Sequence, residues 1–493
     1  MATRDSLILP EQNTCPLLIS APRDQALRQL AQSIQKDESA LTVLSPHAPG
    51  MHGEILDAPS LVIEDHGGIR LFEHSGDEAY SYRTLLLAGD DDLVTIGVAR
   101  HHEFEVYCRD YLGLGSPRAL IPKPAGRDDS LAIRCRKDME FVASVAAHAE
   151  ACGGLNILPY MGTWPVWELA GSIASHCRAP VRVIAPPPQL TRRVNDKIWF
   201  AQLVQSVCGQ TAIPPTHEAD NFSHLCRLAM DLASAHASVA IKLPNSASSA
   251  GNLVLDAELL RCMSWQALHD QLDQRLCAMG WNGSFPLQVV AWELALTSSP
   301  SVQMWIPLVA QGEPLVEAIF EQHSSGLARE FDGARPVQLD SDWQLRIAQQ
   351  AFEIGRVLQY LGYFGRCSLD AIVVGADGDC AQLHWVECNG RWGGVSLPLS
   401  LNRRLDRGRS IPMPFLVFEE AHQHLPARQF HSVIQTLEPF LYRRGLRETG
   451  AVLLSPGRLL EGTGFEIMLR AENIEGAVHT AAKLSALLGK GAI

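Results

Sequence analysis

Short apolar runs alternate with longer helical patterns along residues 93–185, and this alternation restricts the fold more than any other feature of the sequence. The runs Val94–Val98, Leu155–Pro159 and Val181–Ala185 have the length of buried strands, and the helix-like stretches Glu103–Leu112 and Asp138–Cys152 lie between them. This order is typical of βαβ units, which bury a parallel sheet between helices. We therefore expect an α/β domain over residues 90–190, ended by consecutive prolines.

The rest of the chain predicts mixed α and β structure. A helix is expected at Ile198–Cys208, framed by the capping residues Asn195-Asp196 in front and Gly209 behind. A second long helix is expected at Trp343–Leu361, followed by a β-hairpin. The pattern before residue 90 is weak. These features divide the chain into four parts, namely an irregular region 1–89, an α/β domain 90–190, an α+β domain 191–408, and a small α+β domain 409–493.

Composition and charge exclude several classes of protein. The 493 residues include 41 basic and 54 acidic side chains, and the formal charge of −13 argues against nucleic acid or an anionic membrane as the main partner. We find no uncharged stretch suited to a membrane span and no apolar leader, so we expect a cytoplasmic protein. The cysteines are scattered without metal-binding spacing, which favours reduced thiols.

The strongest chemical signal is the stretch Trp385-Val-Glu-Cys-Asn-Gly-Arg-Trp-Gly-Gly394. Because side chains alternate along a strand, Glu387, Asn389 and Arg391 should share one face while Val386 and Cys388 face the other. A carboxylate and an amide oxygen two residues apart suit Mg²⁺, and a neighbouring arginine suits phosphate. The alternative is a solvated, purely structural sheet face.

A turn at Asp377-Gly378 would add a third ligand. A two-residue turn there places Trp385 opposite Asp370, so that Glu387 becomes the diagonal neighbour of Asp370 at about 7–8 Å between backbones. The side chains of Asp370, Glu387 and Asn389 would then converge on one metal. A three-residue turn would break this register.

A second candidate site follows the apolar strand that ends at Lys242. The loop after it consists of small residues, including Ser248, Ser249 and Gly251, which could surround a polyphosphate with backbone N–H groups and hydroxyls. Small-residue loops after strands are common, so an ordinary connection is the alternative. His422 and His424 lack a third ligand at suitable spacing and favour a solvated helix.

Taken in order, these features resemble the ATP-grasp superfamily over roughly residues 191–400. Glu387-x-Asn389-x-Arg391-x-Gly-Gly is the specific part of the likeness, and the upstream residues, ending in Asn195-Asp196-Lys197, look like the Rossmann-like pre-ATP-grasp domain of the pheganomycin-type peptide ligases. The resemblance implies a two-lobed ATP-grasp domain that binds ATP with Mg²⁺, with Mn²⁺ as the alternative ion.

The resemblance also implies roles for individual residues. Lys197 and Lys242 would contact phosphates, Glu293 the adenosine, and Arg391 the γ-phosphate or an acyl phosphate. The metal ligands would be Asp370, Glu387 and Asn389. Ser396 would donate to the acyl phosphate. The family's usual arginine two positions before the metal aspartate is Ser368 here, and Arg366 is the candidate substitute.

The function expected from this resemblance is ATP-dependent joining of a carboxylate to an amine through an acyl phosphate, with ADP and phosphate as products. Small molecules are the expected substrates, with a peptide or natural-product precursor among them, and a homodimer is one assembly that we consider. A carboxylate–thiol ligase and a non-catalytic nucleotide-binding module are the alternatives.

Overall fold

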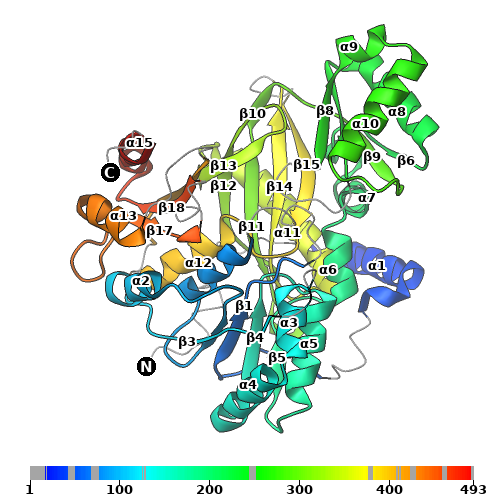
Figure 1. Ribbon diagram of the computed structural model, residues 1–493. Helices are drawn as coiled ribbons and strands as arrows, with labels where there is room; N and C mark the ends of the chain where they lie inside the picture. Colours follow the sequence, from blue (N-terminus) through cyan, green and yellow to red (C-terminus); the bar gives the residue numbers. More distant parts are fainter. Residues whose placement is uncertain are drawn as a thin grey trace.

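The computed structural model describes residues 17, 19–42, 50–67, 77–124, 126, 129–243, 251–375, 381–406, 409, 412–421, 429–457 and 464–489. Its strands form three sheets, which Figure 1 shows as a parallel sheet at the bottom, a large sheet in the middle and a small lobe at the upper right. Within the described residues, no helix is long and apolar enough to cross a membrane.

The first sheet is parallel and has the strand order β3-β2-β1-β4-β5. Its strands are β1 (Ser60–Ile63), β2 (Leu93–Thr95), β3 (Arg118–Leu120), β4 (Leu155–Pro159) and β5 (Val181–Val183). The helices associated with this part of the chain are α2 (His102–Val106), α3 (Leu131–Lys137), α4 (Met139–Cys152), α5 (Trp164–Ala174) and α6 (Pro188–Val194). Because the chain adds strands on both sides of β1, this is a doubly wound α/β sheet. The alternating pattern predicted such a parallel sheet.

The expectation of an irregular region 1–89 was wrong in two places. β1 is the central strand of the parallel sheet, pairing with β2 on one side and β4 on the other. Helix α1 (Ala21–Asp37) packs against the distant helix α11 (Ser341–Tyr360), where Arg23 pairs with Glu353 and Arg356 with Asp24. These partners lie more than 300 residues away in sequence, so local patterns could not reveal them.

The small lobe is a four-stranded antiparallel sheet of order β6-β9-β7-β8, with helices at the upper right of Figure 1. Its elements are β6 (Thr216–Ala219), α8 (Phe222–Ala235), β7 (Ser238–Lys242), β8 (Asn252–Asp256), α9 (Ala257–Cys262), α10 (Trp265–Ala278) and β9 (Leu287–Ala291). Leu225, Ile241, Leu272 and Val289 are completely buried in its own hydrophobic core. Helix α7 (Lys197–Cys208) precedes this lobe.

The large sheet has nine strands, in the order β10-β14-β11-β12-β13-β16-β18-β17, with β15 also paired to β14. Its strands are β10 (Leu296–Ser298), β11 (Pro300–Ile306), β12 (Leu315–Ser325), β13 (Glu330–Pro336), β14 (Gly365–Val374), β15 (Gln382–Asn389), β16 (Phe415–Ala421), β17 (Gly450–Leu453) and β18 (Gly464–Arg470). Helix α11 packs on β11 and β12. The turn between β14 and β15, with Asp377 and Gly378, lies outside the described residues.

The C-terminal strands belong to this same sheet. Gly333 and Ala334 of β13 pair with Phe418 and Val417 of β16. Gly333 has φ +155°, and a Cβ there would lie 2.3 Å from the carbonyl oxygen of Val417, so the close approach of the two strands requires glycine. The boundary that we expected at 408/409 therefore does not separate two sheets. Helices α12 (Ser396–Leu405), α13 (Phe430–Leu437) and α15 (Ile474–Gly489) complete this part.

Candidate functional site

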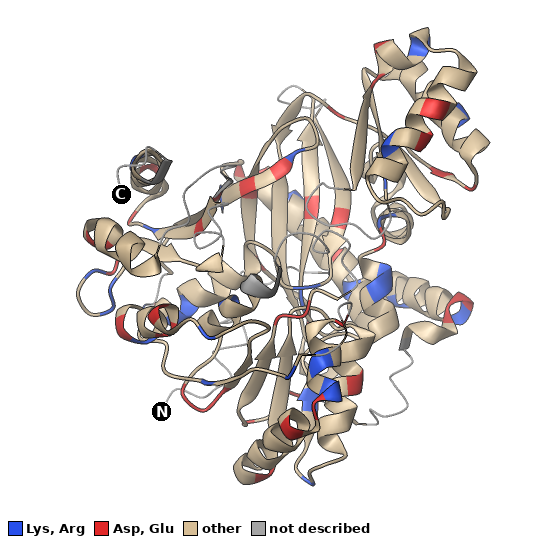
Figure 2. Cartoon of the chain, in the orientation of Figure 1, with Lys and Arg blue, Asp and Glu red and all other residues tan. Residues whose placement is uncertain are grey.

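A cavity of about 450 Å³ lies where the small lobe, the large sheet and the parallel-sheet domain meet. Figure 2 shows acidic and basic residues on several strands of the large sheet. The sequence-predicted residues that line the cavity are Lys197, Lys242, Glu293, Asp370, Glu387, Asn389 and Arg391. Seven predicted residues from five separate segments thus share one cavity.

Strands β14 and β15 bring the predicted metal ligands together, although not in the predicted register. Asp370 pairs directly with Glu387, and Ser368 with Asn389, while Trp385 lies opposite Ala371. A bulge between these pairs inserts one extra residue on β15. The bulge places Val386 on the cavity wall beside Glu387, so the expectation that Val386 faces the core was wrong. Cys388 is buried in the core as predicted.

The Asp370 carboxylate is held by three polar side chains. Its Oδ1 accepts a hydrogen bond from the Ser301 hydroxyl at 2.6 Å, and its Oδ2 accepts one from the Asn389 amide at 2.8 Å. Burial and the adjacent Glu387 carboxylate raise the pKa of Asp370 to about 7, against the lowering effect of hydrogen bonds from Ser301 and Gln322. Burial and the neighbouring carboxylate therefore both disfavour ionisation of Asp370.

Glu387 receives its countercharge from helix α7. The Nζ of Lys197 lies 3.3 Å from Oε2 of Glu387. Burial disfavours the ionised form of Glu387. The positive charges of Lys197, Lys242 and Arg391 outweigh this effect and lower the pKa of Glu387. Lys197 is the first residue of α7, and the Asp196 side chain caps this helix by accepting from the N–H groups of Ile198 and Trp199. The predicted cap thus fixes the position of the lysine.

Lys242 ends β7 and is almost completely buried. Burial, together with repulsion from Lys197 and Arg329, lowers the pKa of Lys242 to about 8. Its Nζ lies 5.8 Å from the ring centroid of Trp292, and the guanidinium of Arg329 lies 4.6 Å from the same ring. Lys197, Lys242 and Arg329 form a positively charged wall that a polyphosphate would complement.

Arg391 is oriented by the residue that precedes the α7 cap. The Asn195 side-chain oxygen accepts from the Arg391 guanidinium and from the Gly390 N–H, the latter at 3.1 Å. A Cβ at position 390 would lie 2.3 Å from Cγ2 of Val194, so glycine is needed for this approach. The Asn-Asp-Lys and Glu-x-Asn-x-Arg motifs therefore touch each other in the folded chain.

Two predicted catalytic residues do not line this cavity. Arg366 forms an ion pair with Glu317, which also pairs with Arg403, and its guanidinium lies 5.0 Å from the centroid of Trp392. The Ser396 hydroxyl accepts from the N–H of Gly393 at 2.6 Å within its own turn. Both side chains thus have structural partners, and the direct roles that we expected for them have no support from this geometry.

Only part of the predicted phosphate loop lies within the described residues. Ser248 and Ser249 lie outside the described residues, as do His422 and His424. Gly251 is described, and its carbonyl oxygen accepts from the N–H of Leu243 at 2.9 Å, which closes the base of the loop.

Sequence reasoning missed several side chains that complete the cavity. Ser301 on β11 and Gln322 on β12 reach Asp370 across the sheet, and Arg329 lies in the turn between β12 and β13. Arg329 has φ +60°, which is uncommon for a residue with a side chain. Single polar residues in strands and turns have no local pattern, and only strand pairing brings them to the site.

The oxygen donors of the cavity fit a magnesium ion. Two carboxylates and one amide oxygen are hard ligands of the kind that Mg²⁺ prefers. Within the described residues, no group of three His, Cys, Asp or Glu side chains could hold a metal alone. Such a partial donor set is usual where substrate phosphates supply the remaining magnesium ligands.

Comparisons with known proteins agree with this architecture. Residues 81–174 match the pre-ATP-grasp domain family. No curated protein matches the sequence significantly. Among solved structures, N5-carboxyaminoimidazole ribonucleotide synthetase with ADP has a TM-score of 0.52 and 13% identity, over 87% of this chain and 97% of that chain.

Two further structures share the fold. The N5-carboxyaminoimidazole synthase of Aspergillus clavatus, with ADP and 5-aminoimidazole ribonucleotide, has a TM-score of 0.50 and 13% identity, over 88% of this chain and 99% of that chain. The biotin carboxylase of Campylobacter jejuni, in a β,γ-ATP complex, has a TM-score of 0.51 and 11% identity, over 86% of this chain and 90% of that chain. Residues 81–174 therefore correspond to a pre-ATP-grasp domain, and the chain as a whole has the fold of the ATP-grasp ligases.

Proposed function

We propose that this protein is an ATP-dependent ligase that joins a carboxylate to an amine through an acyl phosphate. One observation carries the proposal: a single cavity combines the cations Lys197, Lys242 and Arg391 with the oxygen donors of Asp370 and Glu387. A polyphosphate with its magnesium ions needs both kinds of group at short range. A non-catalytic nucleotide-binding module would not require two buried, mutually repelling carboxylates.

The two walls of the cavity have different tasks in this proposal. Lys197 and Lys242 compensate the negative charge of the ATP phosphates, and Glu293, with neighbouring apolar side chains, faces the adenosine. Asp370, Glu387 and Asn389 would hold Mg²⁺, which would neutralise charge that develops on the transferred phosphoryl group. Arg391, held by Asn195, would face the γ-phosphate and then the acyl phosphate.

In the proposed reaction, an oxygen of the substrate carboxylate attacks the γ-phosphorus and ADP leaves. A deprotonated amine then attacks the carbonyl carbon of the acyl phosphate, which forms an amide bond and releases orthophosphate. The resemblance to pheganomycin-type ligases supports an amino acid, a peptide or a natural-product precursor as the carboxylate or amine. Attack at the α-phosphorus would instead give AMP and pyrophosphate.

Product analysis tests this function. Purified protein is incubated with ATP, Mg²⁺ and pools of amino acids and short peptides, and nucleotides, phosphate and product masses are measured. We expect ADP and orthophosphate in equal amounts with a new amide, and a hydroxamate when hydroxylamine replaces the amine. AMP with pyrophosphate would overturn the mechanism, a thioester with pooled thiols would favour the thiol ligase, and nucleotide binding without turnover would favour a binding module.

A further inference from the structure

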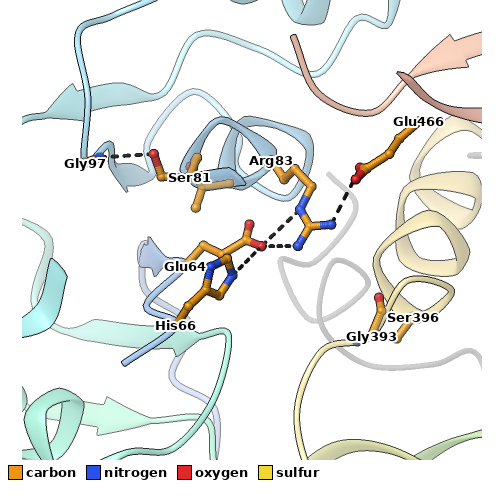
Figure 3. A network of polar contacts seen from close by, with 9 residues as sticks. Glu64, His66, Ser81, Arg83, Gly97, Gly393, Ser396 and Glu466 are labelled. Atoms are coloured by element: carbon orange, nitrogen blue, oxygen red, sulfur yellow. Dashed lines mark hydrogen bonds and ion pairs between the residues drawn. The ribbon is translucent and has the colours of Figure 1, made fainter. Parts of the chain in front are cut away.

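The end of the cavity formed by the parallel-sheet domain and the C-terminal strands has its own network of charges. Glu64 follows β1, Arg83 lies in the 3₁₀ segment η4 (Asp77–Leu86), and Glu466 lies on β18. Nε of Arg83 donates to Glu64 Oε1 at 3.0 Å, and its Nη1 lies 3.7 Å from Glu466 Oε2 (Figure 3). His66 Nε2 lies 3.1 Å from the same Glu64 oxygen.

The charge of Arg83 is already compensated by protein carboxylates. Burial opposes its ionisation, but Glu64 and Glu466 together raise the pKa of Arg83. Burial likewise opposes ionisation of Glu64, and Arg83 and His66 overcome it and lower the pKa of Glu64. Arg83, Glu64 and Glu466 carry one positive and two negative charges, so the trio does not favour a substrate anion.

Glu466 has a carboxylate oxygen with no hydrogen-bond partner in the part of the chain that the structure describes. Its side chain is only 3% exposed and lines the cavity, and Oε1 has no hydrogen-bond partner among the described residues. On the adjacent strand, Glu419 is the residue paired directly with Glu466, and it also lines the cavity. A buried acceptor without a donor is costly. A bound cation would relieve this cost at Glu466.

The opposite end of the cavity differs from this one in its charged side chains. At that end the cations Lys197, Lys242, Arg329 and Arg391 line the cavity together with Asp370 and Glu387, whereas Glu419 and Glu466 lie at this end. Tyr80 and Tyr160 also line the cavity, and the guanidinium of Arg83 lies 4.5 Å from the centroid of the Tyr80 ring. A molecule with a carboxylate and a separate ammonium group matches this distribution of charge.

We propose that the substrate of this ligase is an amino acid or short peptide whose protonated amino group is bound by Glu466 and Glu419. This inference rests on the proposed function, since it places the carboxylate of the same molecule toward Arg391. The bound ammonium is not the nucleophile, because an attacking amine must lose its proton whereas paired carboxylates keep a proton on nitrogen.

Ligand binding tests the inference without requiring turnover. The full-length protein, saturated with ADP and Mg²⁺, is titrated with the twenty common amino acids and their homodipeptides, each beside its N-acetyl derivative, by calorimetry. We expect the compounds that bind to lose about tenfold or more in affinity on acetylation, because a charge-assisted hydrogen bond is lost. Glu466→Gln should cause a comparable loss and leave the affinity for ADP unchanged. The exposed Glu472→Gln is the matched control.

A second measurement uses the protein without any ligand. If Glu466 is kept for a substrate cation, Glu466→Gln removes a buried carboxylate oxygen that has no donor and should raise the melting temperature of the ligand-free protein. If Glu466 serves only to pair with Arg83, the same variant should melt lower. That lower melting temperature, equal binding of acetylated compounds, or no binder in the panel would overturn the inference. Failure of the parent to bind ADP would instead overturn the proposed function.

Discussion

Asp370 and Glu387 lie directly opposite each other on β14 and β15, where like charges repel. The protein compensates this repulsion with Lys197 at 3.3 Å from Glu387 and with the Asn389 amide at 2.8 Å from Asp370. The same four side chains line the cavity. At the scale of single residues, the site therefore consists of opposite charges held close together on buried and half-buried side chains.

Removal of one proposed metal ligand should stop turnover while the fold is retained. We expect Glu387→Gln and Asn389→Ala each to reduce ADP formation by about 10²- to 10³-fold, the range for loss of one preorganised electrostatic group. Steady-state assays and far-UV circular dichroism measure both properties. The exposed Glu218→Gln on β6 serves as the control and should retain parental activity. Parental turnover in either ligand variant would contradict the assignment.

Nucleotide affinity should depend on the protonation of Lys242. Since the pKa of Lys242 is about 8 in the free protein, the lysine is charged below pH 8 and must take up a proton to bind phosphate above it. We expect the affinity for ADP to fall by up to about tenfold per pH unit above pH 8. Calorimetry from about pH 6.5 to about pH 9.5 measures this affinity. The variant Lys242→Met should bind ADP weakly, with an affinity that does not change with pH. The same pH dependence in both proteins would contradict a role for Lys242 protonation.

At the scale of elements, the start of helix α7 couples stability to the site. The Asp196 side chain accepts from the N–H of Ile198 at 2.9 Å and thereby fixes the first turn, which carries Lys197. We expect Asp196→Ala to lower the free energy of unfolding by about 1 kcal/mol and to weaken ADP binding. Asp196→Asn keeps a capping oxygen and should retain most of both. Urea unfolding and calorimetry measure the two effects, and equal losses in both variants would argue against capping as the cause.

The bulge in β15 is the other element on which the site depends. The pairs nearer the turn, such as Val374 with Gln382, would continue to Val386 opposite Asp370, and the bulge places Glu387 there instead. It also brings Val386 and Glu387 to the same wall of the cavity. Alternation along the strand correctly predicted the faces on which Glu387, Asn389 and Cys388 lie. It could not predict the bulge, because no pattern in this sequence marks the inserted residue.

At the scale of the whole molecule, the C-terminal residues are part of the large sheet and of its main core. β16 pairs with β13, and Leu416, Val433 and Ile467 share a hydrophobic cluster with residues of the parallel-sheet domain. Arg470 forms a buried ion pair with Asp406.

A chain truncated at residue 408 should therefore lose the cooperative fold. Removal of the residues after 408 exposes the edge of β13 and the apolar side chains that β16 and β18 cover. We therefore expect aggregation or a loosely packed state. Analytical size exclusion, near-UV circular dichroism and scanning calorimetry measure this against the full chain. A soluble truncated protein with an unchanged melting transition would show that the C-terminal part folds independently.

The sequence by itself determined the local elements and the identity of the chemical groups. Alternating runs predicted the parallel sheet, capping residues predicted α7, and the polar face of residues 387–391 predicted the cavity side of β15. These features depend on neighbours within a few residues. The cation pair Lys197 and Lys242 was assigned through a resemblance that joins distant motifs, and the structure places both in one cavity.

Only the tertiary structure decided which distant residues meet. It placed β1 in the centre of the parallel sheet, united the C-terminal strands with the large sheet, and paired Arg366 with Glu317 outside the main cavity. It also set Glu466 beside Arg83, almost 400 residues away in sequence. The physical reason is that strand pairing and buried ion pairs join segments of any separation, so their energies depend on the whole fold and leave no pattern in the local sequence.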